Sequence, residues 1–202
     1  MSNKPGLVTF TFDDGVSANY NQLLDILKKE DIKATFFVIG SSLMASRIPR
    51  LKRAHDEGHT IGNHTWSHTN MTHLSPELLK KEVNATSEKI ESIIGIKPKY
   101  IRPPYGAINN IVRSELAAMG YTVVLWNVDA EDWDPKRSDE TVWKYYEDLF
   151  SKTDPTKHSY IILQHDRAVR SVEMVPKIIK LVRDKGFKIV SLDEYLHGPH
   201  TA

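Results

Sequence analysis

Two histidines four residues apart are the first sign of chemistry in this sequence. His64 and His68 bound the segment His64-Thr-Trp-Ser-His68, and on a helical turn this spacing puts both imidazoles on one face, where they could bind one metal ion. Zinc proteases carry a glutamate directly after the first such histidine, whereas Thr65 occupies that position here. A base that activates water would have to come from elsewhere. The alternative to a metal site is that two surface histidines share a turn by accident.

Two adjacent aspartates, Asp13 and Asp14, end an apolar run and could supply the third ligand and the base. Adjacent side chains at the end of a strand point in different directions, so one carboxylate can bind metal while the other faces water. An Asp-Asp-Gly turn with no chemistry is also common. Likewise, His165 after an apolar strand could be an ordinary core histidine, and Arg102 before two prolines could form a structural ion pair.

The elements that must position these residues alternate between strands and helices. Apolar patterns predict strands at 7–12, 34–39, 59–61, 100–102, 121–126, 160–164 and 187–190, and helices at 20–27, 49–57, 76–94, 111–119 and 175–185. Glycine follows several of these helices, as expected where a helix ends before a strand. The alternation indicates a mainly parallel sheet, open or closed into a barrel. Side chains at the carboxyl ends of its strands gather on one face, and these are Asp13, Asp14, His64, His68, Arg102, Asp129, Asp132, His165 and Asp166.

Composition narrows the classes of partner. The 202 residues contain 27 Lys and Arg against 26 Asp and Glu, so the protein has no strong net charge that would favour binding to nucleic acid or to an acidic membrane surface. The absence of cysteine excludes cysteine-ligated zinc and iron–sulfur clusters. No apolar stretch reaches membrane-spanning length, and no linker divides the chain. We expect one domain over residues 1–202, a monomer, and a secreted or cell-wall-associated protein whose leader is absent from this sequence, with a cytoplasmic location left open.

Five short motifs follow one another along the chain. They are Thr11-Phe-Asp-Asp-Gly15, His64-Thr-Trp-Ser-His68, Arg102-Pro-Pro-Tyr-Gly106, Asp129-Ala-Glu-Asp-Trp133 and Leu163-Gln-His165. Together they resemble the motifs of the polysaccharide deacetylases of the NodB-homology type, carbohydrate esterase family 4. The resemblance spans residues 7–196 and implies an α/β fold, a distorted (β/α) barrel with mainly parallel strands and fewer than eight regular ones.

The resemblance also implies a role for each matching residue. One divalent metal ion, with Zn²⁺ expected first and Co²⁺ or another ion as alternatives, would be held by Asp14, His64 and His68. Asp13 would be the general base and His165 the general acid. Arg102 would hold Asp13, and Asp132 would hold His165. The backbone N–H of Tyr105 would join the metal in binding the oxyanion, and Trp133 and Leu163 would wall the pocket for the acetyl methyl group.

These parts meet the needs of amide hydrolysis, which requires an activated water, oxyanion stabilisation and protonation of the leaving nitrogen. We predict a metal-dependent deacetylase that removes acetyl groups from N-acetylglucosamine units of chitin or chitooligosaccharides, since segments 23–29 and 98–102 look most like chitin deacetylases. The alternatives are a peptidoglycan N-acetylglucosamine deacetylase, an acetylxylan esterase with the same site, and a non-catalytic carbohydrate-binding relative. A purely structural metal site would need a fourth protein ligand, which the motifs do not provide.

Overall fold

The chain forms two compact units, each built from separate stretches of sequence. In this computed structural model residues 4–198 are described, so the ends of the expected domain, 1–3 and 199–202, lie outside the described residues. The first unit comprises residues 1–12, 17–35 and 126–202, and the second comprises 13–16 and 36–125. The backbone passes from one unit to the other at 12/13, 16/17, 35/36 and 125/126. That the two make up one domain stays a prediction.

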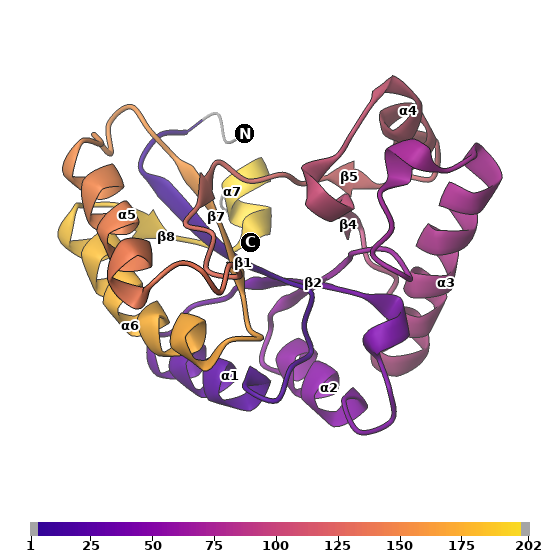
Figure 1. Cartoon of the computed structure of the whole chain (residues 1–202), viewed down its shortest axis with the longest axis horizontal. Coiled ribbons are helices and arrows are strands. Elements are labelled where there is room, and N and C mark those ends of the chain that lie inside the picture. Colours follow the sequence, from indigo (N-terminus) through magenta and orange to yellow (C-terminus); the bar gives the residue numbers. More distant parts are fainter. Residues whose placement is uncertain (1–3, 199–202) are drawn as a thin grey trace. The chain divides into compact units, whose positions relative to one another are not determined.

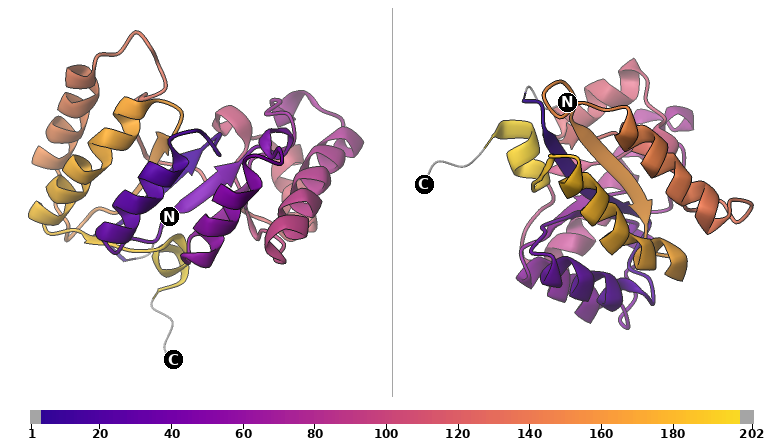
Figure 2. Two further views of the ribbon diagram at one scale, coloured as in Figure 1. Left: turned by 90° about the horizontal axis from the view of Figure 1, so that it is seen from below. Right: turned by 90° about the vertical axis from the view of Figure 1, so that its left-hand side faces the viewer.

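The first unit is a set of parallel strands with helices beside them. Its strands are β1 (Leu7–Asp13, of which Asp13 belongs to the second unit), β6 (Val128–Asp129), β7 (Tyr160–His165) and β8 (Lys188–Ile189), and its helices are α1 (Tyr20–Lys29), α5 (Asp139–Ser151), α6 (Val169–Asp184) and α7 (Leu192–His197). Strand β7 lies between β6 and β1, and the pairs β6–β7 and β1–β8 are parallel. Helix α6 contacts both α1 and α5 (Figures 1 and 2).

The second unit repeats this arrangement. It contains β2 (Thr35–Val38, of which Thr35 belongs to the first unit), β3 (Thr60–Asn63), β4 (Tyr100–Ile101), β5 (Thr122–Val123), the helices α2 (Ile48–Asp56), α3 (Pro76–Ile94) and α4 (Asn110–Ala118), and the 3₁₀ turns η1 (Gly40–Ser42), η2 (Met71–His73) and η3 (Pro104–Gly106). The strand order is β5-β4-β3-β2, with β3–β4 and β4–β5 parallel. Helix α3 contacts α2 and α4 (Figure 1), and its buried Leu79 and Val83 pack with Ile101, Val112 and Leu116.

Local signals account for the ends of α3. The Ser75 side chain accepts a hydrogen bond from the Leu78 N–H, which caps the helix, and Pro76 occupies its first position. Gly95 ends the helix with a left-handed φ of 76°, a conformation that residues with a β-carbon resist. These caps agree with the helix that the sequence predicts.

Several elements differ from those that the sequence predicts. Helices α5 and α7 were not predicted, although Ser138 and Ser191 cap them and apolar residues at helical spacing face inward from α5. Helix α6 starts at residue 169 instead of 175. Strand β5 covers two residues instead of six, and β6 is an additional short strand. Among the described residues, none of the helices has the length and apolar character needed to cross a membrane.

Candidate active site

Three possible metal ligands converge in the second unit. Nε2 of His64 lies 3.4 Å and Nε2 of His68 lies 3.3 Å from Oδ1 of Asp14. One ligand atom from each of the three residues lies within 4.8 Å of the others. Two imidazoles and one carboxylate form a donor set that suits zinc, and three protein ligands leave coordination positions open for water and substrate. The chemistry of the donor set therefore fits the metal that the sequence predicts.

The segment that carries the two histidines is a loop, which corrects the expected helical turn. Residues 64–68 follow β3 without helical structure, and Thr65 and His68 have left-handed φ values of 64° and 60°. The side chain of Asn63 accepts the Thr65 N–H at 2.8 Å, and the Thr65 hydroxyl accepts the His68 N–H at 3.1 Å. These side-chain acceptors take N–H groups that a helix would bond to its own backbone. The ring centroids of the two histidines still come within 4.8 Å of each other.

The tautomer of His64 is set by its second ring nitrogen. Nδ1 lies 2.7 Å from the carbonyl oxygen of Arg102, and both groups are buried. Because a carbonyl oxygen can only accept, Nδ1 must carry a proton, so in the neutral ring the lone pair is on Nε2, the nitrogen that faces Asp14. This is the tautomer that metal ligation requires.

Asp13 forms a buried ion pair with Arg102. Nη1 of Arg102 donates to Oδ1 of Asp13 at 2.7 Å, and Asp13 is only 3% exposed. The guanidinium is itself fixed, since Nε donates to the Val124 carbonyl at 3.1 Å and the group lies 4.3 Å from the centroid of the Phe37 ring. The second Asp13 oxygen lies 3.6 Å from Nε2 of His64. One carboxylate oxygen is thus held by arginine, while the other lies beside the ligand cluster.

Tyr105 belongs to the same unit as the ligand cluster. It has a left-handed φ of 61° within η3, its ring centroid lies 4.7 Å from that of His68, and its side chain is exposed. The use of its backbone N–H as an oxyanion donor stays a prediction.

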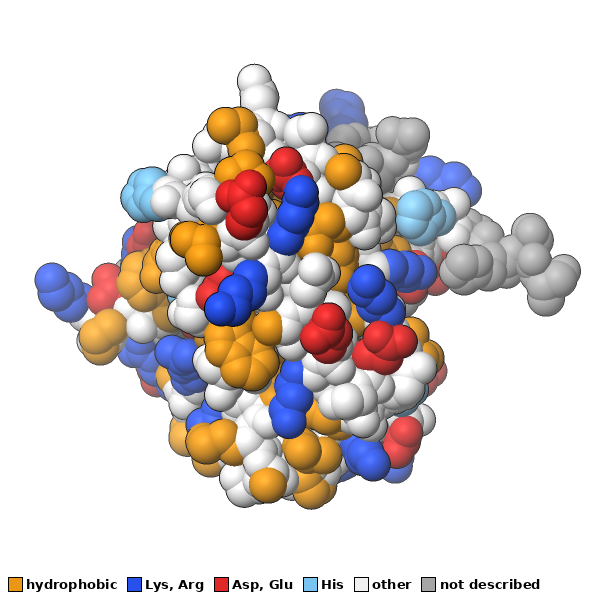
Figure 3. Space-filling view, turned by 90° about the vertical axis from the view of Figure 1, so that its right-hand side faces the viewer, with side chains coloured by type: hydrophobic (Ala, Val, Ile, Leu, Met, Phe, Trp, Pro, Cys, Tyr) orange, Lys and Arg blue, Asp and Glu red, His pale blue; other side chains and the backbone are white. Residues whose placement is uncertain are grey.

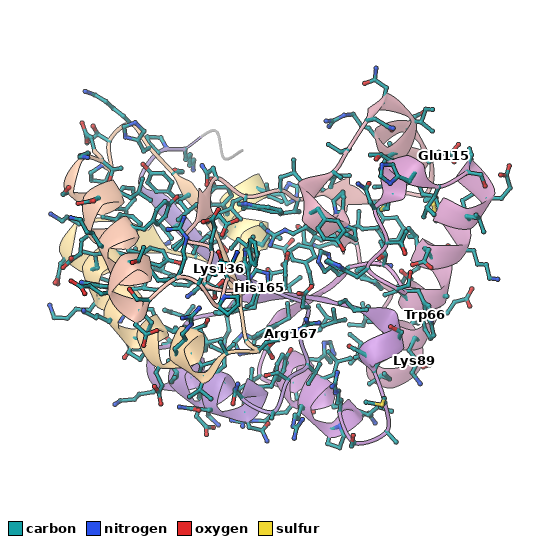
Figure 4. All side chains as sticks on the ribbon, viewed as in Figure 1. Trp66, Lys89, Glu115, Lys136, His165 and Arg167 are labelled. Atoms are coloured by element: carbon teal, nitrogen blue, oxygen red, sulfur yellow. The ribbon has the colours of Figure 1, made fainter. Side chains whose placement is uncertain are left out.

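The expected acid lies in the first unit, at the end of β7 (Figure 4). Nδ1 of His165 lies 2.8 Å from Oδ1 of Asp132, and the other oxygen of Asp132 accepts the backbone N–H of His165 at 2.9 Å. Asp132 is only 2% exposed. A single buried carboxylate therefore fixes both the ring and the backbone of His165.

A second carboxylate and an arginine support this pair, and the sequence did not assign them roles. Burial raises the pKa of Asp129 above the ordinary carboxyl value, although the Glu131 N–H, 2.8 Å from Asp129 Oδ1, and the nearby His165 oppose this effect. Arg170, in the first turn of α6, donates to the carbonyl of Asp132 at 3.1 Å. The place of Asp129 in the same motif was an available signal, whereas Arg170 lies 38 residues from its acceptor.

The two residues expected to wall the acetyl pocket also lie in the first unit. Trp133 is 57% exposed and directly follows Asp132, whereas Leu163 in β7 is buried. Their contact with an acetyl group stays a prediction.

Comparison with known proteins gives the family. Residues 1–124 match the sequence profile of the family described as polysaccharide deacetylase. The chain belongs to this family of carbohydrate-active hydrolases, carbohydrate esterase family 4.

Three relatives show where the chain stands within the family. The chitin deacetylase of Colletotrichum lindemuthianum is 32% identical over 201 residues, which cover 96% of this chain and 80% of that protein. Its solved structure gives a TM-score of 0.90, covering 98% of this chain and 91% of the other, which confirms the predicted NodB-type (β/α) fold class. The peptidoglycan-N-acetylmuramic acid deacetylase PdaC of Bacillus subtilis is 38% identical over 189 residues. A family pseudoenzyme from Bacillus anthracis gives a TM-score of 0.85 at 25% identity, covering 98% of this chain and 67% of the other.

The relatives differ in how much of their length this chain represents. The alignment with PdaC covers 93% of this chain but only 38% of PdaC. The family is therefore settled, whereas the polysaccharide is not, because the relatives include proteins named for chitin and for peptidoglycan.

Proposed function

We propose that this protein is a metal-dependent N-deacetylase that hydrolyses the N-acetyl group of N-acetylglucosamine units in chitin or chitooligosaccharides and releases acetate. The observation that carries the proposal is the preformed set of Asp14, His64 and His68, with the Asp13–Arg102 pair beside it. A pseudoenzyme exists in the family, so turnover rests on these side chains and not on the fold.

Asp14, His64 and His68 would hold the metal, with Zn²⁺ proposed first and Co²⁺ or another divalent ion as alternatives. When bound, such an ion supplies Lewis acidity, which polarises a carbonyl and makes water more acidic. The lone pair that His64 Nε2 presents toward Asp14 supports this assignment.

The remaining steps fall to side chains of the protein. Asp13, ion-paired with Arg102, would accept the proton of the attacking water as general base. His165 would donate a proton from Nε2 to the amide nitrogen as the C–N bond breaks, so that the amine leaves and acetate is formed. The buried carboxylate of Asp132 favours the protonated form of His165. The backbone N–H of Tyr105 would stabilise the oxyanion, and Trp133 and Leu163 would contact the acetyl methyl group.

Structural similarity supports chitin as the first substrate to test. The chitin deacetylase of Colletotrichum lindemuthianum gives a TM-score of 0.90, compared with 0.85 for the peptidoglycan N-acetylglucosamine deacetylase Bc1960. Surface charge agrees with a neutral polymer, since acidic and basic side chains are interspersed on the face that Figure 3 shows. We further propose that the protein acts as a monomer outside the cell or at the cell wall, where such polymers occur.

Mass spectrometry of reaction products tests the substrate. The Zn²⁺-loaded protein is incubated in parallel with chitin oligomers, peptidoglycan fragments and acetylated xylan, with the Asp13→Asn variant as a matched control. We expect chitin oligomers to lose acetyl groups fastest and the control to leave them intact. Faster turnover of peptidoglycan or xylan would assign that substrate instead, and no turnover of any of the three would contradict the deacetylase.

A further inference from the structure

The loop that carries both histidines, residues 64–68, is attached to helix α3 at two places. Asn63, just before the loop, donates from its side-chain amide to the Val83 carbonyl and to the Ser87 hydroxyl, each at 2.8 Å. Glu82, the residue before Val83 in α3, reaches the middle of the loop. Figure 4 shows Trp66, from the centre of the loop, beside α3.

The carboxylate of Glu82 accepts three hydrogen bonds from two successive loop residues. Its Oε2 accepts the backbone N–H groups of Trp66 at 3.0 Å and of Ser67 at 2.8 Å. Its Oε1 accepts the hydroxyl of Ser67 at 3.0 Å. Hydrogen bonds to an ionised acceptor are stronger than those between neutral groups, and here they converge on one side chain.

These two N–H groups lie between the two strained positions of the loop. Thr65 and His68 both have left-handed φ values, which are unfavourable for residues with a β-carbon, and such a backbone persists only where its surroundings hold it. The carbonyls of Thr65 and Trp66 are held on the opposite side, by the N–H groups of Gly40 and Ser41 at 3.0 Å each. Glu82 supplies the corresponding acceptor for the N–H side of the loop.

The ring of Trp66 packs against Gly40 of η1, where Thr86 of α3 also comes close. A β-carbon placed on Gly40 would lie 2.6 Å from Cε3 of Trp66 and 2.6 Å from the hydroxyl oxygen of Thr86 in α3. The loop therefore fits closely between η1 and α3. This close packing leaves little room for the loop to move toward η1.

We propose that Glu82 is a positioning residue for the metal centre. By holding the N–H groups of Trp66 and Ser67, it keeps the loop in the conformation that places His68 beside Asp14. This inference rests on the proposed function only in taking Asp14, His64 and His68 as a metal site. Glu82 contacts Trp66 and Ser67, which lie between the two histidines, so its effect is on how well the site is formed before metal arrives.

Three substitutions at this position separate geometry from charge. Glu82→Ala removes the acceptor, and Glu82→Asp keeps the charge but shortens the side chain by one methylene group. We expect both to weaken Zn²⁺ binding about 10–100-fold, the usual effect of losing a residue that orients ligands. Glu82→Gln should stay near the wild-type affinity, because its amide oxygen can still accept both N–H groups and its NH₂ can donate to Ser67. Glu88→Ala, at an exposed position on the same helix, is the matched control.

Two measurements on the full chain test the proposal without any turnover. Zn²⁺ affinity is determined by competition with a chromophoric chelator, and amide hydrogen exchange at residues 66 and 67 is followed in metal-free protein. We expect faster exchange at both amides in the alanine and aspartate variants, at an unchanged thermal midpoint. If the alanine variant does not fold, the comparison of Glu82→Asp with Glu82→Gln decides.

The outcomes separate this inference from the proposed function. Wild-type affinity and unchanged exchange in Glu82→Ala and Glu82→Asp would overturn the role of Glu82 while leaving the metal site intact. A wild-type protein that bound no Zn²⁺ would instead overturn the metal site itself.

Discussion

Replacing Asp132 by asparagine should move the alkaline limb of the pH–rate profile to lower pH. His165 must carry a proton to act as the acid, and the Asp132 carboxylate, 2.8 Å from Nδ1, stabilises the imidazolium form. Without that negative charge the imidazolium loses its proton at lower pH, so the rate falls earlier as pH rises. Asparagine also has a single acceptor oxygen, whereas Asp132 accepts from both the ring and the backbone N–H of His165. The maximal rate should therefore fall as well.

The size of the shift follows from burial and from the neighbouring charges. Two unit charges about 4 Å apart interact by about 4 kcal/mol at an effective dielectric constant of about 20. At about 1.4 kcal/mol per pKa unit this energy corresponds to about 3 pKa units. Asp129 remains as a second carboxylate that interacts with His165, and it retains part of the effect. We expect a displacement of about 1–2 pH units.

The assay is acetate release by the Zn²⁺-loaded variant at saturating chitin oligomer across the pH range. Glu131→Gln serves as the control for loss of one negative charge in the same motif, because Glu131 is ion-paired with Arg137 and its side chain is 42% exposed. Asp129 is unsuitable as a control, since its carboxylate interacts with both His165 and Asp132. An alkaline limb that does not move in Asp132→Asn, or that moves equally in Glu131→Gln, would refute the proposed acid pair.

Three further substitutions probe the base, the core and a buried carboxylate. Asp13→Asn should lower the rate at least about 100-fold yet retain one equivalent of zinc by elemental analysis; loss of the metal together with activity would make Asp13 a ligand. Tyr146→Phe removes a buried hydroxyl that has no hydrogen-bond partner among the described residues. The free energy of unfolding, measured with urea, should therefore stay unchanged or rise by up to about 1 kcal/mol. A clear loss of stability would show that the hydroxyl has a partner. Burial raises the pKa of Asp166, so its ionisation costs stability once pH exceeds the ordinary carboxyl range. Asp166→Asn should therefore gain stability relative to wild type as pH rises above about 4, and a difference in unfolding free energy that does not change with pH would contradict this.

The sequence predicted most of the fold because its local signals were strong. Ser75, Pro76 and Gly95 define α3 through capping, and the apolar run before Asp13 defines β1. Helix α5 carried a comparable signal, with an N-cap at Ser138 followed by buried residues at helical spacing, but it went unassigned.

The site was predictable only where function depends on residue type and order. Strand ends predicted that His64 and His68 lie on the same face as Asp13 and Asp14, and the family resemblance selected Asp14 as the ligand. The left-handed loop between the histidines was not predictable, because its conformation depends on side-chain acceptors outside it. The contact of Glu82 with residues 66 and 67 arises from the packing of α3 beside β3, and no local pattern encodes that proximity.

The most direct test of metal-dependent deacetylation is acetate release by one protein sample before and after removal of its metal. Chitin oligomer is supplied to the Zn²⁺-loaded protein, to the same sample after exhaustive chelation, and to that sample after Zn²⁺ is restored, with an Asp14→Ala variant treated in parallel. We predict turnover that is lost on chelation, returns with Zn²⁺ in the wild-type chain, and stays absent in the variant. Full turnover by the metal-free protein, or by the variant, would contradict the metal centre formed by Asp14, His64 and His68.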